Sequence, residues 1–151
     1  MIFWDTSAIV PLLVDERATP LVRAALKPDD PMVVWWGTPV EALSALCRRG
    51  REGGLTRPAL LLARRRLVVL SHAWHELIPS ASIREHADNL LLRHPLRAAD
   101  ALQLGAALTL AQGRPTGHRF ATLDERLADA ALGEGFDLVF PDLDHPIEGA
   151  P

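Results

Sequence analysis

The chain has 151 residues, a length that suits a single domain with a buried core, and we expect one domain over residues 1–151 with a loose tail from about residue 141. Its 16 basic and 19 acidic side chains leave a net charge of −3, which gives no support to a generic phosphate-backbone binder, because such proteins are usually basic. The single cysteine excludes an internal disulfide, and the chain has neither the basic segment of a signal peptide nor an apolar run near ~18 residues, so we expect a cytoplasmic protein that does not enter membranes.

The first strand is predicted at the start of the chain. Residues 2–5 are apolar up to a final carboxylate, and a short helical pattern follows directly. Thr6 or Ser7 can act as the N-cap of that helix, with Pro11 in its first turn, where proline is tolerated. A second helix is expected over residues 19–26 from the spacing of its apolar side chains.

A continuous apolar run, "MVVWW" over residues 32–36, is predicted as the second strand. Gly37 ends this run, and Thr38 can cap a helix that has Pro39 at its first position. Residues 57–72 have a helical pattern, although the "LVVL" run inside them is also compatible with a strand.

The second half of the chain alternates helical and extended patterns. We expect helices over residues 82–93, 98–111 and 125–132, and strands over residues 74–78, 119–123 and 136–140. Strands separated by helices indicate an α/β fold, with a mostly parallel sheet of four or five strands covered by helices on both faces. In such sheets, ligands bind outside the carboxyl ends of the strands.

Four carboxylates are expected at that edge of the sheet. Asp5 ends the first strand and Asp124 follows a later one, whereas Glu41 and Asp100 lie in the first turns of helices. Each alone has an ordinary explanation, because acids are favoured as N-caps and in first helical turns. Four carboxylates that converge on one edge repel one another, however, so such a cluster needs a cation or raises its pKa values.

The chemistry of this cluster favours a hard cation. All four side chains offer oxygen, with no cysteine and no evident histidine beside them, and this donor set suits Mg²⁺ or Mn²⁺. Such ions at carboxylates serve phosphoryl or phosphodiester chemistry. A haloacid-dehalogenase-like phosphatase would need an acid at the position of Ser7. A response-regulator receiver would need a lysine on a late strand, and the only lysine is Lys27, in an early loop.

Four segments of the chain carry motifs in a recognisable order: "IFWDTSAIVPLL", "TPVEALSALCRR", "HPLRAADALQLGAAL" and "FATLDERLADAALGEGF". They resemble the successive motifs of the PIN-domain ribonucleases, most closely those of the VapC-type toxins of bacterial toxin–antitoxin pairs. The match covers roughly residues 1–140. The resemblance implies a PIN-like three-layer α/β/α sandwich and an endoribonuclease that depends on Mg²⁺ or Mn²⁺ and leaves 5′-phosphate and 3′-hydroxyl ends.

The resemblance also assigns roles to particular residues. The family's acidic quartet, which is catalytic and binds metal, is matched by Asp5, Glu41, Asp100 and Asp124. Thr6 or Ser7 matches the hydroxyl that follows the first acid and orients a carboxylate, and which of the two does so stays open. Thr122 matches a polar position often found two residues before the last acid.

Implied partners are an RNA substrate, a second copy of the chain in a homodimer, and a cognate VapB-type antitoxin that can put a basic side chain into the acidic site. Within the chain, Arg97 is the basic side chain nearest the predicted site and is a candidate for a substrate or partner contact. The arginines at 48, 49 and 51 and at 64–66 either contact phosphates or belong to solvated helix faces.

Two other functions stay open from the sequence. One is a catalytically inert PIN-like module that binds RNA or an antitoxin without cutting, against which the intact quartet argues. The other is a metal-dependent phosphohydrolase that acts on a small phosphate ester. RNA cleavage and small-ester turnover distinguish the three.

Overall fold

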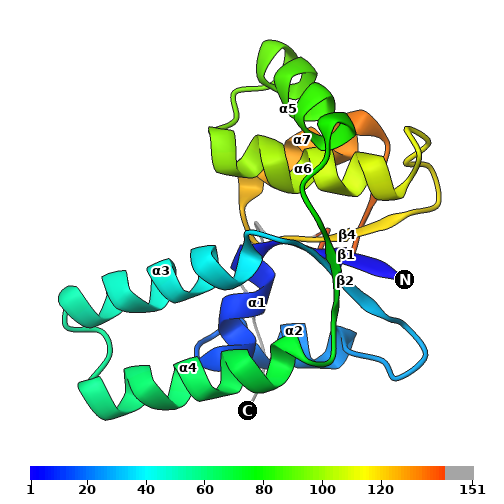
Figure 1. The fold of residues 1–151 in the computed structure, drawn as a ribbon. Helices are drawn as coiled ribbons and strands as arrows, with labels where there is room; N and C mark the ends of the chain where they lie inside the picture. Colours follow the sequence, from blue (N-terminus) through cyan, green and yellow to red (C-terminus); the bar gives the residue numbers. More distant parts are fainter. Residues whose placement is uncertain (142–151) are drawn as a thin grey trace.

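A computed structural model of the protein describes residues 1–141 and shows one sheet with helices on both sides (Figure 1). The strands are β1 (Ile2–Trp4), β2 (Met32–Trp35), β3 (His75–Leu77), β4 (Arg119–Ala121) and β5 (Asp137–Leu138). The helices in this part of the chain are α1 (Thr6–Leu13), α2 (Thr19–Ala25), α3 (Thr38–Arg51), α4 (Arg57–Ser71), α5 (Ala81–Arg93), α6 (Ala98–Leu110) and α7 (Glu125–Glu134). Among them, none is long and apolar enough to cross a membrane. The predicted tail lies, from residue 142 onward, outside the described residues.

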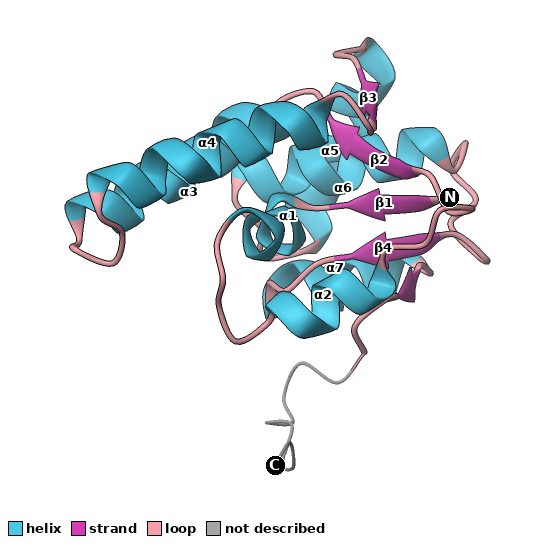
Figure 2. Cartoon of the chain, turned by 90° about the horizontal axis from the view of Figure 1, so that it is seen from below, coloured by secondary structure: helices cyan, strands magenta, loops and turns pink. Residues whose placement is uncertain are grey.

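The sheet has the strand order β3-β2-β1-β4-β5, and every neighbouring pair of strands is parallel. β1 therefore lies at the centre, with β2 and β4 beside it (Figure 2). Helices α5, α6 and α7 cover one face, α1 and α2 cover the other, and α3 and α4 form a hairpin that extends beyond the sheet (Figure 1). The predicted α/β/α sandwich is confirmed, with five strands that are all parallel.

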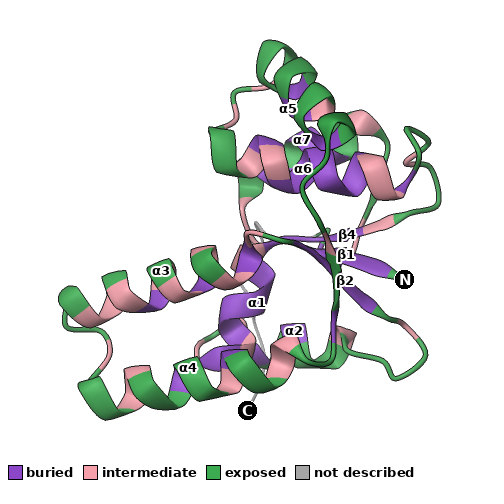
Figure 3. Cartoon of the chain, in the orientation of Figure 1, coloured by how far each residue is buried: buried purple, intermediate pink, exposed green. Residues whose placement is uncertain are grey.

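The central strand supplies both hydrophobic cores. Successive side chains of a strand point to opposite faces, so Ile2 and Trp4 pack into the core that contains α1, whereas Phe3 enters the core beneath α6. There the ring of Phe3 stacks on that of Phe120 in β4, with 5.3 Å between the ring centroids. Figure 3 shows the buried residues along β1, β2 and β4 and on α1 and α6. Burial on both faces explains why β1 and β2 are apolar throughout.

The expectation that Thr6 or Ser7 caps α1 is wrong, whereas the explanation of Asp5 as a helix N-cap is confirmed. Asp5 caps this helix, because its side chain accepts the backbone N–H of Ser7 at 3.0 Å while its own backbone stays extended, continuing β1. Thr6 is therefore the first helical residue, and Pro11 lies in the second turn rather than the first. The acid that ends the strand and the acid that starts the helix are thus one residue.

The predicted start of α3 is also wrong by one residue. Gly37 precedes the helix, Thr38 is its first residue and Pro39 its second. Thr38 is fully buried and its hydroxyl accepts a hydrogen bond from the distant Gln103, so it is not used as a cap. The alternative strand inside residues 57–72 is excluded, since α4 is continuous through "LVVL".

Strands β4 and β5 are shorter than predicted. β4 ends at Ala121 and not at Leu123, and β5 spans only Asp137–Leu138. Beyond Ala121 the chain leaves the ladder, and the Thr122 hydroxyl bonds to Asp5 instead. The residues just after β4 therefore contact Asp5 at the edge of the sheet and do not lengthen the strand.

A glycine lets α5 and α6 approach closely. A Cβ atom at Gly105 of α6 would lie 2.8 Å from the carbonyl oxygen of Ile83 and 3.1 Å from the backbone nitrogen of Ala87, both in α5. Backbone atoms of a packed helix cannot yield as a flexible side chain can, so any larger residue must push the two helices apart.

We predict that Gly105→Ala lowers the free energy of unfolding by about 1–3 kcal/mol, the usual cost of overpacking. Gly50→Ala is the matched control, because a Cβ there meets its nearest neighbour, Leu60, at an ordinary 3.6 Å. The control should be neutral or slightly stabilising, as alanine is the better helix former. Urea unfolding of both variants measures the difference, and equal stability of the two would contradict the close approach.

Candidate active site

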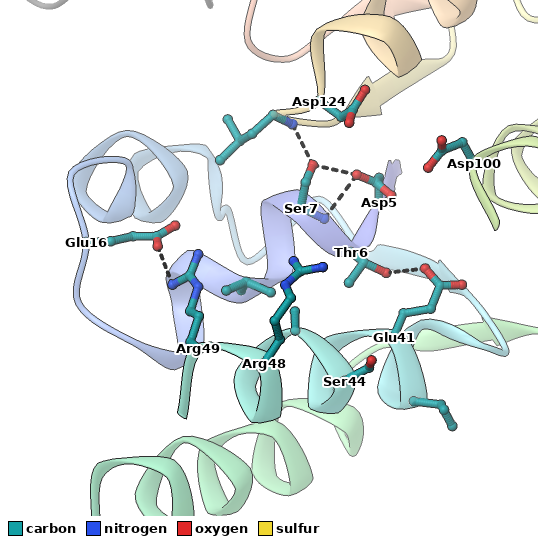
Figure 4. Close-up of a pocket in the computed structure, with 14 residues that line it drawn as sticks. Asp5, Thr6, Ser7, Glu16, Glu41, Ser44, Arg48, Arg49, Asp100 and Asp124 are labelled. Atoms are coloured by element: carbon teal, nitrogen blue, oxygen red, sulfur yellow. Dashed lines mark hydrogen bonds and ion pairs between the residues drawn. The ribbon is translucent and has the colours of Figure 1, made fainter. Parts of the chain in front are cut away.

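The four predicted acids line one pocket of about 660 Å³ beside the carboxyl end of β1 (Figure 4). Asp5 follows β1 directly, and Glu41 lies in the first turn of α3, which follows β2. Asp100 lies in the first turn of α6, and Asp124 is the N-cap of α7 just after β4. Elements far apart in the sequence therefore bring the four carboxylates to one place, as the parallel topology predicts.

Asp5 is the most buried of these acids, with an exposed fraction of 5%. Its Oδ2 atom accepts hydrogen bonds from the backbone N–H of Ser7, from the Ser7 hydroxyl and, at 3.0 Å, from the Thr122 hydroxyl. Each hydroxyl in turn accepts a backbone N–H, Ser7 from Leu123 at 2.7 Å and Thr122 from Asp124 at 3.1 Å. This network fixes the orientation of the Asp5 carboxylate.

Burial raises the pKa of Asp5 from its ordinary value of 3.8 to about 6. Loss of hydration disfavours the charged form, and the neighbouring Glu41 carboxylate adds to the effect. The hydrogen bonds from Ser7 and Thr122 act in the opposite direction, because they stabilise the anion. A bound cation would therefore stabilise the ionised Asp5, because its charge compensates for the hydration that burial removes.

Glu41 is held by a separate network. Its Oε2 atom accepts hydrogen bonds from the Thr6 hydroxyl and from Nε2 of Gln103, both at 2.9 Å. Nε2 of Gln103 also lies 2.9 Å from the Thr6 hydroxyl and 3.2 Å from that of Thr38, so two amide protons are shared among three oxygens. The two hydroxyls after β1 therefore divide their work: Ser7 orients Asp5 and Thr6 orients Glu41.

Gln103 is the residue that sequence reasoning missed. It is almost fully buried in α6, and its carboxamide oxygen has no hydrogen-bond partner within residues 1–141. Exchanging the amide oxygen and nitrogen would place that oxygen against the Glu41 carboxylate, so the hydrogen bonds determine the orientation. A signal was present in the sequence: a lone amide in an apolar helix, three residues after Asp100 and hence on the same side.

Asp100 and Asp124 each use one oxygen for a helix start. Oδ2 of Asp100 accepts the backbone N–H of Arg97 at 3.3 Å, and Oδ1 of Asp124 accepts that of Leu127 at 2.9 Å. The ordinary explanation of acids as helix caps is thus correct for part of each side chain. It does not account for the other oxygen.

All four carboxylates share one feature. In each, a single oxygen is engaged, and the second oxygen receives no hydrogen bond from the described part of the chain. The second oxygens are Oδ1 of Asp5, Oε1 of Glu41, Oδ1 of Asp100 and Oδ2 of Asp124. Anions with a fixed orientation and an unused oxygen suit metal coordination, and oxygen-only donors suit Mg²⁺ or Mn²⁺.

The four acids are not close enough together to coordinate one ion all at once. Within residues 1–141 no three acidic, histidine or cysteine side chains are placed to hold one ion together. An ion here would be held by fewer carboxylates at once together with water. Mg²⁺ favours this arrangement, because it gives up its hydration water reluctantly and is usually bound through one or two carboxylates.

Arg97 is less central than its position in the sequence suggests. Its backbone N–H bonds to Asp100, but its exposed side chain is not part of the pocket lining. Two arginines of α3 line the pocket instead, Arg48 and Arg49. A contact of Arg97 with substrate or partner stays a prediction.

We predict that Asp5→Asn stabilises the ion-free protein at about pH 8 and loses this advantage at about pH 4. The folded state holds the Asp5 proton more tightly than the unfolded chain, since the folded pKa is about 6 against an ordinary 3.8. The wild type therefore loses stability as pH rises through this interval, by on the order of 3 kcal/mol, whereas asparagine keeps the hydrogen bonds without the charge.

Urea unfolding in a chelator at both pH values measures this difference. Asp29→Asn is the control, because it removes the same charge from an exposed side chain. An Asp5→Asn variant that is less stable than the wild type at the higher pH would show that burial does not strain this carboxylate.

Comparison with known proteins identifies the family. A family model described as PIN domain matches residues 2–132. Two curated proteins of Mycobacterium tuberculosis, Ribonuclease VapC45 from strain CDC 1551 / Oshkosh and Ribonuclease VapC49 from strain ATCC 25618 / H37Rv, are similar to this chain. Each is 31% identical to it over 135 residues, which are 89% of this chain and 92% of the relative.

Solved structures share the fold at lower sequence identity. VapBC-1 from nontypeable Haemophilus influenzae superimposes with a TM-score of 0.60 and 17% identity, over 92% of this chain and 98% of that one. A toxin–antitoxin complex from Klebsiella pneumoniae gives a TM-score of 0.55 and 15% identity, over 85% and 91%. With the family match and the 31% identical relatives, the conclusion is direct: the chain belongs to the PIN-domain family and, within it, to the VapC proteins.

Proposed function

We propose that this protein is a metal-dependent endoribonuclease and the toxin of a VapBC-type toxin–antitoxin pair. The observation that carries the proposal is the set of four oriented carboxylates, each with one unused oxygen, on one pocket. The ribonuclease names of the relatives at 31% identity support RNA as the substrate. The sequence has no glycine-rich phosphate-binding loop, so an ion held by the carboxylates would have to bind the phosphate in this pocket.

The residues that would hold Mg²⁺ or Mn²⁺ are Asp5, Asp100, Asp124 and Glu41, of which one or two would bind the ion directly and the others through its water molecules. Such an ion supplies a water of lowered pKa as nucleophile and neutralises charge that develops on the scissile phosphate. Asp5 would bind the ion through Oδ1 in a single orientation, because the hydroxyls of Ser7 and Thr122 donate hydrogen bonds to Oδ2.

The supporting side chains keep the acids ready to act. The hydroxyls of Ser7 and Thr122 each donate their one hydrogen to Oδ2 of Asp5, which leaves Oδ1 available to a ligand. Thr6 and Gln103 do the same for Glu41, which cannot turn away while two donors hold its Oε2. Preorganisation of this kind reduces the rearrangement that an ion and a substrate would otherwise demand.

Protein partners follow from the same family assignment. We infer a cognate VapB-type antitoxin, since the two solved structures described above are a toxin–antitoxin complex and VapBC-1. An acidic pocket lined by four carboxylates would accept a basic antitoxin side chain in place of a cation. A homodimer is part of the proposal as well, as is a cytoplasmic location.

We predict that Asp100→Asn lowers RNA cleavage in Mg²⁺ or Mn²⁺ by about 100-fold or more, because removal of even a supporting group of a metal site costs about 10–100-fold. Gel analysis of cleaved RNA, with mapping of the 5′-phosphate and 3′-hydroxyl ends, measures this. Asp29→Asn, an exposed acid outside the pocket, should cleave like the wild type.

Full cleavage by Asp100→Asn, or by the wild type in excess chelator, would contradict the proposal. RNA binding by the wild type without any fragments would favour an inert binding module. Hydrolysis of small phosphate esters without RNA cleavage would favour a phosphohydrolase.

We predict that Mn²⁺ raises the melting temperature of the wild type at about pH 8, and that Asp5→Asn loses most of this rise. An ion that binds only the folded state stabilises it in proportion to the logarithm of its concentration, and the variant removes the buried anion. Thermal unfolding over a Mn²⁺ titration gives the answer independently of activity. An equal rise in both proteins would place the ion elsewhere.

A further inference from the structure

The wall of the pocket formed by α3 carries more than an acid. Glu41, Ser44 and Arg48 all line the pocket and are spaced three and four residues apart, which puts them on one face of the helix. Helical rise places Arg48 about 10 Å along the axis from Glu41. Figure 4 shows the Arg48 side chain extending from α3 toward α1, beside the carboxylates rather than among them.

The two arginines of this wall are in different states. Nη1 of Arg49 donates to Oε2 of Glu16 at 2.6 Å, so its charge is already paired. The guanidinium of Arg48 makes neither a hydrogen bond nor an ion pair with any of residues 1–141, and the residue is exposed. Arg48 is thus the pocket-lining cation that keeps all its donors for a ligand.

The local charge around this wall is opposite to that of the chain. Between Thr38 and Ser71, the α3–α4 hairpin holds seven arginines and two glutamates, although the whole chain has a net charge of −3. A polyanion that approaches the acidic pocket is therefore attracted on the α3 side. The exposed Arg64 of α4 shares this charge but does not line the pocket.

We propose that Arg48 binds a backbone phosphate of the RNA next to the one held at the carboxylates. The guanidinium offers paired N–H donors that match two phosphate oxygens, and the exposed Ser44 hydroxyl lies on the same wall. Arg48 in this role is a substrate-binding residue that sets where the chain of phosphates leaves the pocket. The inference rests on the proposed function, because RNA as substrate is itself inferred.

The test compares two arginines of equal charge in a protein that binds RNA without cutting it. In an Asp100→Asn background with Mg²⁺ present, Arg48→Ala should weaken binding of a single-stranded RNA oligonucleotide by about tenfold, the loss expected for one charged hydrogen-bonded contact. The slope of log affinity against log salt concentration should fall by about 0.7, the contribution of one phosphate on a single strand. Arg64→Ala should change neither quantity.

Two further measurements distinguish a phosphate contact from a structural effect. Arg48→Lys should keep the salt slope and recover only part of the affinity, since lysine has the charge without the paired donors. In the otherwise wild-type protein, Arg48→Ala should raise KM for RNA more than it lowers kcat, with an unchanged melting temperature.

Three outcomes would overturn the role of Arg48. They are unchanged RNA binding in Arg48→Ala, equal losses in the Arg48 and Arg64 variants, and loss of antitoxin binding with normal RNA binding, which would make Arg48 an antitoxin contact. Each of these is compatible with RNA cleavage by the wild type. Absence of cleavage by the wild type in either metal would instead contradict the proposed function.

Discussion

The site depends on a buried carboxylate at the end of the central strand. Asp5 is 5% exposed, and its backbone N–H still bonds to the carbonyl of Ala121 at 2.9 Å, which ties the ends of β1 and β4 together. Its Oδ2 atom gathers donors from Ser7 and from Thr122, more than a hundred residues apart in the chain. The same side chain thus starts α1, joins two strand ends and leaves one oxygen for the pocket.

Structural and chemical roles coexist because a carboxylate has two oxygens. Asp5, Asp100 and Asp124 each satisfy backbone N–H groups at a helix start with one oxygen. This bond limits the rotation of the side chain and so directs the second oxygen. Helix capping, which could have been a rival explanation for the acids, is instead the means by which they are oriented.

Strand ends and helix starts made the acids predictable from sequence. Parallel topology brings the carboxyl ends of β1 and β4 together, so Asp5 and Asp124 could be placed without coordinates. The contribution of β1 and β2 to the core was predictable as well, because strands that are buried on both faces of a parallel sheet are apolar throughout. The exact start of α1 was not, because Asp5, Thr6 and Ser7 are all good caps, and tertiary partners decide among them.

Long-range polar contacts were beyond sequence reasoning. The bond from Gln103 to Glu41 spans 62 residues and depends on how α6 faces α3. Arg97 is close to Asp100 in sequence, yet the pocket is lined by Arg48 from another helix. Neighbours in the chain share an element, but which side chains share a pocket depends on packing between elements.

The most direct test of the metal site is the structure of crystals grown with Mn²⁺, with anomalous scattering recorded to locate the ion. If the four acids form the metal site, the strongest anomalous peak lies in the pocket within coordination distance of Oδ1 of Asp5, with Oδ2 still bonded to Ser7 and Thr122. A pocket that remains without a peak at saturating Mn²⁺, or a peak that contacts none of the four carboxylates, would contradict it.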